Sequence, residues 1–352
     1  MKKPQQTLLK ASLGLAATSA ALLCASAQAQ TQTLYIGMNG GNMERTYTQF
    51  VFPPFEKAHN VKVVVVPGTS TDILAKAQAA KGKAQMHVMT LDDGIMYRAI
   101  GMGLCEKLQP GEHLASLPQI TRIKDQAVGL SMGLTGLAYS TKAFTDQGWA
   151  PPTSWGDLAD AKYKGKVVVQ SMPASSFGLH AFLMFNRLKG GNESNVNPGF
   201  EAWPETIGPN VVEYIPNSSK IVEMMQAGDA ALFPYTFTQT ELMKSKGAAM
   251  EFVAPKEGAV VLMTAQCALA DNPDSAMAHK LMDYLVSPEA QALAMEHGSY
   301  NPVNPQTPLK GKAAEDQTRM NEILKSAVVL DWDVINAERP AWSKRWNRTV
   351  ER

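Results

Sequence analysis

Histidine and cysteine, the residues that most often build metal centres, are scarce in this sequence. Six histidines and three cysteines occur among 352 residues. The histidines are scattered, with neither the H-E-x-x-H spacing nor a Cys-His cluster, so the pattern predicts no metal site. A complete dinucleotide fingerprint is missing as well, because Gly40-Gly41 lacks the third glycine at the required spacing. We therefore expect no cofactor.

Long apolar runs are equally scarce, and the run that stands out lies at the N-terminus. Three lysines precede an apolar stretch at 11–23, and two small-x-small sites follow it, ending at Ala27 and Ala29. A charged start, a short apolar stretch and a small-residue site are typical of a secretory signal peptide. We expect residues 1–29 to be removed and the mature chain to lie outside the cytoplasm. The alternatives are an uncleaved anchor, or lipid attachment at Cys24, which the large residue before it disfavours.

An excess of either charge is also missing. The chain has 33 Lys and Arg against 32 Asp and Glu, a formal charge of +1, and removal of the three signal-peptide lysines would change it to −2. Such a balance argues against a nucleic acid or an anionic membrane as partner. Hydrophobic residues at 45% and charged residues at 18% are typical of a globular chain, and its length suggests about two domains.

Two cysteines remain after the signal peptide, Cys105 and Cys267. In an oxidising compartment they can pair as a disulfide. Each also lies in an apolar stretch, where a buried free thiol is equally ordinary. The sequence leaves both possibilities open, because pairing depends on the distance between the two Cα atoms.

What the sequence does contain is an alternation of strand and helix patterns. Strands are predicted at 34–36, 61–66 and 86–91, with helices at 43–57 and 72–81 between and after them. This order predicts a mostly parallel sheet with crossover helices, and the β-branched second strand is typical of burial on both faces. Ligands of such sheets bind at the carboxyl ends of the strands. The loops at those ends contain Asn39, Gly40, Gly41, Asn42, Thr69, Ser70 and Asp92.

The alternation restarts in the second half of the chain. Strands are predicted at 134–140, 166–170, 211–215 and 230–233, and a helix follows Ser175 and Ser176. Neither an internal repeat nor a low-complexity linker separates the halves. We therefore expect two α/β lobes joined by crossing strands, rather than two independent domains on a string.

Several local motifs allow two interpretations. Gly40-Gly41 is either a simple turn or a place where a ligand approaches the backbone near a helix N-terminus. Asp92 and Asp93 form either a solvated loop or a ligand contact through one carboxylate. Tyr235 near a strand end is more typical of a core residue than of a stacking group.

One motif suggests an enzyme. The segment 129–133 matches G-x-S-x-G, the nucleophile elbow of serine hydrolases, with Ser131 as the nucleophile. The elbow needs a strand before it and a helix after it, whereas the pattern here predicts a strand after it. We expect no enzyme and keep a secreted serine hydrolase as the alternative from another class.

A series of short segments points to a family. They are, in chain order, Phe52-Pro-Pro-Phe-Glu-Lys, Gly68-Thr-Ser-Thr-Asp, Leu91-Asp-Asp, Gly136-Leu-Ala-Tyr-Ser-Thr-Lys, Pro152-Thr-Ser-Trp-Gly-Asp-Leu, Leu285-Val-Ser-Pro-Glu, Tyr300-Asn-Pro-Val-Asn and Trp342-Ser-Lys-Arg-Trp. In this order they resemble the spermidine/putrescine-type solute-binding proteins of ABC importers, over essentially the whole mature chain.

The resemblance implies the type 2 periplasmic-binding-protein fold. Lobe I would comprise 31–137 and 262–305, and lobe II would comprise 138–261 and 306–352. Each lobe would be a mostly parallel sheet flanked by helices, and hinge strands would let the lobes close on a small solute. The resemblance further implies a periplasmic monomer that delivers its solute to the membrane permease of an ABC importer.

Departures from the family bear on the solute. Polyamine binders of this family hold ammonium groups with an aromatic and an acidic side chain, where this chain has Leu262 and Thr264. A segment that carries acids in those proteins carries hydroxyls here, at 171–176. Iron-binding relatives use neighbouring tyrosines, and no such pair occurs. We therefore expect an amino acid-like solute, an organic acid or a phosphonate, with a polyamine as the alternative. The predicted ligand contacts are Asn39, Gly40, Gly41, Asn42, Thr69, Ser70, Asp92, Ser175, Ser176, Tyr235, Thr264 and Tyr300.

Overall fold

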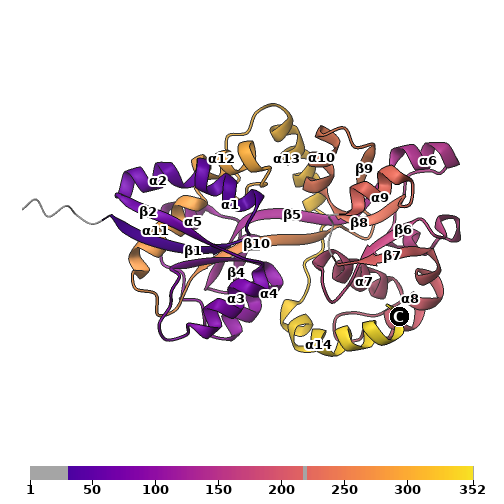
Figure 1. Cartoon of the computed structure of the whole chain (residues 1–352), viewed down its shortest axis with the longest axis horizontal. Helices are drawn as coiled ribbons and strands as arrows, with labels where there is room; N and C mark the ends of the chain where they lie inside the picture. The colour runs from indigo at the N-terminus through magenta and orange to yellow at the C-terminus, as the bar shows by residue number, and fades with distance from the viewer. Residues whose placement is uncertain (1–30, 217–219, 352) are drawn as a thin grey trace, which may run out of the picture.

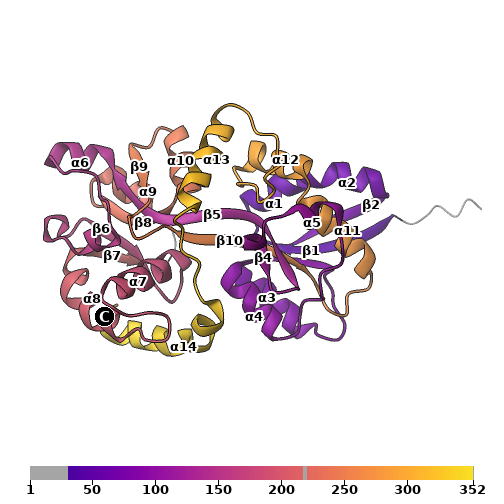
Figure 2. The ribbon, with the colours of Figure 1, turned by 180° about the vertical axis from the view of Figure 1, so that it is seen from behind.

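The computed structural model describes residues 31–216 and 220–351 (Figure 1). The predicted signal peptide lies outside the described residues. The backbone forms one ten-stranded sheet in the order β2-β1-β3-β10-β5-β8-β6-β7, with β4 and β9 paired to β5. Helices cover the sheet on both sides (Figures 1 and 2).

The first half of the molecule, on the left of Figure 1, is built on three parallel strands. Its elements are β1 (Gln32–Met38), α1 (Asn42–Thr46), α2 (Phe52–His59), β2 (Val61–Pro67), α3 (Ser70–Ala79), β3 (Val88–Asp92), α4 (Asp93–Gly101) and α5 (Glu112–Ser116). A turn of π-helix at Tyr47–Val51 joins α1 to α2, so the predicted helix at 43–57 is continuous but not regular.

Two long strands cross from the first half to the second. They are β5 (Ala127–Ser140) and β10 (Val260–Ala268), which pair antiparallel with each other, and β10 also pairs antiparallel with β3. The short strands β4 (Arg122–Ile123) and β9 (Met250–Val253) flank β5. The parallel strands thus lie within each half, and the antiparallel pairs lie where the chain crosses.

The second half contains the parallel pairs of β6 with β7 and with β8. Its elements are α6 (Thr141–Gln147), β6 (Val167–Gln170), α7 (Ser176–Leu188), α8 (Asn197–Thr206), β7 (Val211–Ile215), α9 (Ile221–Ala227), β8 (Leu232–Thr236) and α10 (Phe237–Ser245). The C-terminal part adds α11 (Ser275–Leu285), α12 (Pro288–Gly298), α13 (Gly311–Leu324) and α14 (Trp332–Thr349).

Two predictions about strands were wrong. The valine-rich strand β2 is the edge of the sheet, so Lys62 is exposed and Val64 is only half-buried, rather than buried on both faces. Strand β5 begins at Ala127 and not at residue 134. Gly129 of this strand leaves no room for a side chain, because an added Cβ would lie 2.7 Å from the Met263 sulfur atom of the neighbouring strand.

Separate hydrophobic clusters support the two halves. The first gathers β1 to β3, α11 and α12, and the second gathers β6, α7 and α8 around Trp155 and Trp203. Helix α13 contributes Met320 to the first cluster, whereas α14 contributes Trp342 and Trp346 to the second. The residue boundaries given above for the two lobes stay a prediction.

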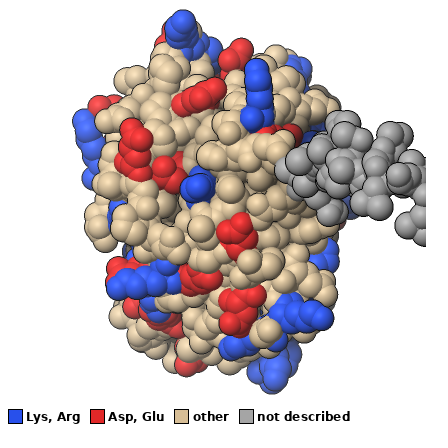
Figure 3. Space-filling model, turned by 90° about the vertical axis from the view of Figure 1, so that its left-hand side faces the viewer, with Lys and Arg blue, Asp and Glu red and all other residues tan. Residues whose placement is uncertain are grey.

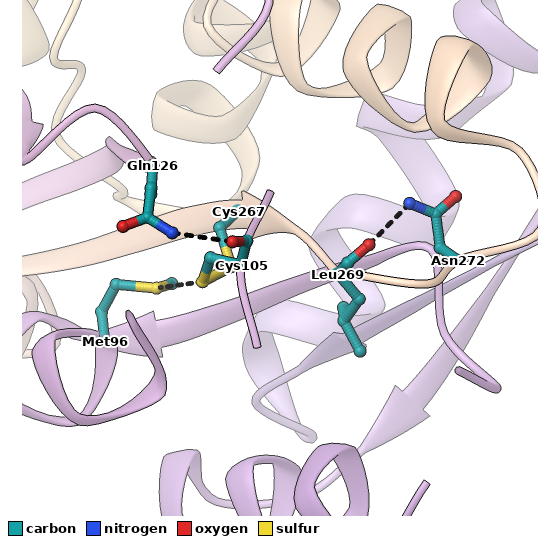
Figure 4. Close-up of a disulfide and its surroundings, with 6 residues drawn as sticks. All are labelled: Met96, Cys105, Gln126, Cys267, Leu269 and Asn272. Carbon is teal, nitrogen blue, oxygen red and sulfur yellow. Dashed lines mark hydrogen bonds between the residues drawn. A yellow bond between two sulfur atoms is a disulfide. The ribbon is translucent and has the colours of Figure 1, made fainter. Parts of the chain in front are cut away.

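A disulfide joins Cys105, just after α4, to Cys267 of β10, with the Cα atoms 5.7 Å apart (Figure 4). Of the two possibilities that the sequence left open, the structure has the bonded one. The Gln126 side chain donates a 2.8 Å hydrogen bond to the Cys105 carbonyl, and Asn272 donates to the Leu269 carbonyl nearby. The bond therefore fixes a crossing strand to the first half of the molecule.

Surface charge, membrane-spanning helices and metal-binding groups are three further features of the described residues. Figure 3 shows Lys and Arg interspersed with Asp and Glu over the end of the first half. Within 31–216 and 220–351, no helix has the length and apolar character needed to span a membrane. In the same part of the chain, no group of three or more His, Cys, Asp or Glu side chains is placed to hold a metal ion.

Candidate functional site

Two adjoining hollows lie between the halves of the molecule. One of about 530 Å³, which we call the arginine hollow, is lined by residues that include Thr69, Ser70, Asp92, Arg98, Ser176 and Arg339. The other, of about 520 Å³, is called the tyrosine hollow, and its lining includes Asn42, Ser131, Phe177, Thr236, Thr264 and Tyr300. They adjoin at the start of α7, where Ser176 lines the first and Phe177 the second.

The start of α3 brings hydroxyl groups to the arginine hollow. Thr69 and Asp72 form a capping box, in which the Asp72 amide donates to the Thr69 hydroxyl oxygen at 3.2 Å. The Thr69 hydroxyl donates in turn to the Asp72 carboxylate, which lowers the pKa of Asp72. Ser70 accepts a 3.0 Å hydrogen bond from the Asp92 amide, so the start of α3 is joined to the end of β3. A helix N-terminus of this kind attracts anions.

Asp92 and Asp93 open helix α4 and differ in their surroundings. Asp92 lines the arginine hollow; burial raises its pKa, whereas Ser70 and Arg339 act in the opposite direction. Asp93 is buried, and burial, followed by the charge of Asp92, raises its pKa to about 8. The interpretation as a solvated loop was therefore wrong for this pair, because both carboxyl groups pack against other elements.

The start of α7 places its two serines differently. The Ser175 hydroxyl donates to the Gln170 side-chain oxygen at 2.6 Å and accepts from the Phe177 amide at 3.1 Å. It is the N-cap of the helix, and its single hydroxyl proton is already donated within the protein. Ser176, one residue on, lines the arginine hollow.

The two arginines of this hollow were missed by the sequence analysis. Arg98 lies on α4 and Arg339 on α14. Among the described residues, neither has a carboxylate within 4.0 Å. Arg339 donates to the Met172 carbonyl at 3.4 Å, and burial, together with the charge of Arg98, lowers its pKa. No local pattern marks Arg339, since the polar groups that it joins in the hollow, Thr69, Asp92 and Ser176, lie far away in the sequence.

The tyrosine hollow contains three predicted contacts. The Asn42 side chain donates to the Tyr300 hydroxyl and to the Gly298 carbonyl, both at 3.3 Å. Thr264, on crossing strand β10, lies in the same lining. Burial raises the pKa of Tyr300, so its hydroxyl stays protonated and can donate to a solute.

The other predicted contacts lie apart from the two linings. Tyr235 is buried and packs edge-on against Phe177 at 6.0 Å and against Phe233, in a core cluster. Gly40 and Gly41 are exposed, and Gly41 has a φ of 71°, at the start of a helix of five residues.

Ser131 lies within strand β5, paired with Thr264 of β10. A nucleophile elbow is a turn between a strand and a helix, which this position is not. Within the described residues, the Ser131 side chain makes no hydrogen bond to a histidine. The hydrolase alternative therefore lacks both the backbone turn and the base that it needs.

Two α/β halves, joined by crossing strands around hollows lined with polar side chains, define a two-lobed binding protein. The chain belongs to the bacterial extracellular solute-binding protein family, whose sequence profile matches residues 51–321. The predicted family and the two-lobed type 2 fold are confirmed. The narrower resemblance to spermidine/putrescine-type proteins stays a prediction.

Individual relatives are distant. The chain is 24% identical to the gamma-aminobutyric acid-binding protein of Pseudomonas aeruginosa over 292 residues, 80% of this chain and 79% of that protein. The crystal structure of an ABC transporter protein from Clostridium perfringens is similar with a TM-score of 0.79 at 19% identity, covering 90% of this chain and 99% of that one. A periplasmic binding protein of Actinobacillus pleuropneumoniae with fructose-6-phosphate bound has a TM-score of 0.70 at 21% identity, covering 91% and 98%.

Proposed function

We propose that this protein is the periplasmic solute-binding component of an ABC importer and that it captures a small organic anion between its two halves. The family membership and the two-lobed fold support the transport role. The membrane permease of the importer is the proposed partner, and the protein is proposed to act as a monomer without catalysis. The predicted contacts in the two hollows are the proposed ligand contacts, now with Arg98 and Arg339 added.

The observation that carries the proposed solute class is the charge of the arginine hollow. Two guanidinium groups face one carboxylate there, and neither arginine has an acidic partner within 4.0 Å among the described residues. A polyamine would bring further positive charge beside two arginines, which is unfavourable. A carboxylate, phosphonate or phosphate would pair with them through charge-assisted hydrogen bonds.

Asp92 limits the proposed class of solute further. Its carboxylate lines the same hollow and is the proposed partner for an amine of the solute. A solute with both groups, such as an amino acid-like molecule, would satisfy both signs of charge. The names of two of the compared proteins, one for gamma-aminobutyric acid and one with fructose-6-phosphate bound, include molecules with an anionic group.

Calorimetry with a panel of solutes tests the proposal. The panel contains amino acids including gamma-aminobutyric acid, dicarboxylic acids, phosphonates, sugar phosphates, putrescine and spermidine. We expect at least one acid to bind, and Arg339→Gln to weaken it by about tenfold to a hundredfold, the worth of a hydrogen bond to a charged group. Lys344→Gln, an exposed change on the same helix, is the control. Tight spermidine binding without a response to any acid would overturn the proposal.

A further inference from the structure

Helix α14 lies along the second half of the molecule, and its start lies toward the first half (Figures 1 and 2). Its residues Asn336 and Arg339 line the arginine hollow. The helix is anchored along its length in the second hydrophobic cluster, through Trp332, Ile335, Trp342 and Trp346. Its first turns lie on α4 of the first half, where the Asn336 side chain donates to the Gly94 carbonyl at 2.8 Å. The Trp332 ring fills the space beside Gly94, within 2.4 Å of an added Cβ. The docking of α14 on α4 is therefore a contact between the two halves.

The two arginines lie on the faces that make this contact. Gly94 and Arg98 are one turn apart on α4, and Asn336 and Arg339 are three residues apart on α14, so each pair shares a helix face. Asn336 of α14 also lines the arginine hollow, and so does Ile95 of α4. Both arginines line the arginine hollow.

The positive charges of Arg98 and Arg339 therefore oppose the docking of the two helices. Arg339 is partly buried, whereas Arg98 is exposed. Like charges repel more strongly where burial excludes water, so the burial of Arg339 strengthens the repulsion and the exposure of Arg98 limits it. Burial is the main cause that lowers the pKa of Arg339, and the charge of Arg98 lowers it further, whereas Asp92 acts in the opposite direction. Asp92 offsets one of the two charges and leaves the other uncompensated.

We infer that one oxyanion of the solute binds between Arg98 and Arg339 and, by neutralising both charges, holds α14 against α4. This inference rests on the proposed function, since it gives the anionic group of that solute a second role. Guanidinium groups bind carboxylate, phosphonate and phosphate oxygens in pairs, so one oxyanion can engage an arginine on each side. The charge of the solute then controls the contact between the halves, and an uncharged analogue of the same shape leaves α14 less tightly docked.

Hydrogen exchange of the full chain tests the repulsion without any solute. The variant is Arg98→Met, an exposed position whose side chain makes no hydrogen bond among the described residues. We expect the amides of 93–101 and 332–340 to exchange about two- to fivefold more slowly than in the wild type, because one like charge is removed. Lys57→Met, which removes an exposed charge on α2, should exchange as the wild type does. Equal or faster exchange in Arg98→Met would overturn the inference.

A second arm uses sodium sulfate as the oxyanion, against sodium chloride at matched ionic strength. Sulfate should slow exchange of the same amides in the wild type but not in Arg98→Met. Arg339→Lys keeps the positive charge and should exchange like the wild type in chloride. A sulfate response of equal size in the wild type and Arg98→Met, or none in the wild type, would contradict the inference. If acids bind in calorimetry while these exchange results fail, the inference alone is wrong; if no acid binds, the proposed function is wrong.

Discussion

At the scale of single residues, the Asp93 carboxyl group is the point where three elements meet. It accepts a 2.9 Å hydrogen bond from the Gly94 amide at the start of α4, and the Met263 amide on β10 and the Trp332 side chain on α14 lie near enough to lower its pKa. Burial is the main reason that its pKa rises to about 8, and the charge of Asp92 adds to the shift. Below that pH the group is neutral in the folded protein.

The shift predicts a pH dependence of stability. Between pH 4 and 8 the unfolded chain has Asp93 ionised while the folded chain keeps it protonated, so folding takes up a proton. The free energy of unfolding should therefore fall as pH rises across this window. Asp93→Asn cannot ionise, so we expect its free energy of unfolding to fall less between pH 4.5 and pH 7.5 than that of the wild type. Compared with the wild type, the variant should therefore perform better at pH 7.5 than at pH 4.5. Urea denaturation at both pH values measures this.

The control for this experiment is Asp229→Asn, an exposed carboxylate in the second half of the molecule. It should leave the pH dependence unchanged. A wild-type slope that persists undiminished in Asp93→Asn would show that Asp93 ionises in the folded protein at its ordinary pKa.

Because the two serines at the start of α7 make different contacts, we expect their alanine variants to lose different properties. Ser175→Ala removes the helix cap and the bond to Gln170, and should lower the free energy of unfolding by about 1 kcal/mol. Ser176→Ala should weaken solute binding with little change in stability, because its side chain lines the hollow. Denaturation and calorimetry on both variants separate the effects. The reverse result would place the solute at Ser175.

At the scale of elements, the packing of α14 on α4 depends on a glycine. A Cβ at Gly94 would lie 2.4 to 2.9 Å from three atoms of the Trp332 ring, so any side chain there displaces α14. By contrast, Gly101 at the end of the same helix has no atom within 4 Å of an added Cβ. One helix thus offers a blocked and an open glycine for comparison.

We expect Gly94→Ala to destabilise the protein by about 1–3 kcal/mol, the usual cost of overpacking. Gly101→Ala should be neutral or stabilising, because alanine favours the helix. Thermal denaturation followed by tryptophan fluorescence gives both the stability and the state of the Trp332 surroundings. Equal stability of the two variants would mean that α14 adjusts without cost.

The elements also show what local sequence could predict. The alternation of strands and helices, the loop before Ser70 and the strand end at Asp92 were predicted because each depends on neighbouring residues. The first half of β5 was missed because Gly129 resembles a strand break, although it is needed for the close approach of β10. Arg98 and Arg339 were missed because they meet only through the docking of two helices that lie far apart in the sequence.

At the scale of the whole molecule, the chain crosses between the halves on β5 and β10, and a disulfide ties β10 to the segment after α4. The bonded cysteines are separated by 162 residues, so the closed loop contains most of the second half. A cross-link over such a long loop restricts the unfolded chain strongly.

Removal of the bond should therefore destabilise the first half. We expect Cys105→Ala with Cys267→Ala to lower the free energy of unfolding by about 2–5 kcal/mol. Solute affinity should stay nearly unchanged, because neither cysteine lines the arginine or the tyrosine hollow. Chemical denaturation and calorimetry are the measurements. A variant as stable as the wild type would mean that the packing around the bond carries its stability.

The position of β10 between β3 and β5 also has a consequence in time. The chain is synthesised from its N-terminus, so β1, β2 and β3 are made early. The strand that joins them to β5 is β10, which is made only when synthesis reaches residues 260–268. The segment from α6 to β9, which is most of the second half, must be made before β10 can complete the sheet. Contacts between residues so distant in sequence form slowly. A chain that cannot finish its first half early stays unfolded for longer, which is the state in which a polypeptide can be threaded across a membrane.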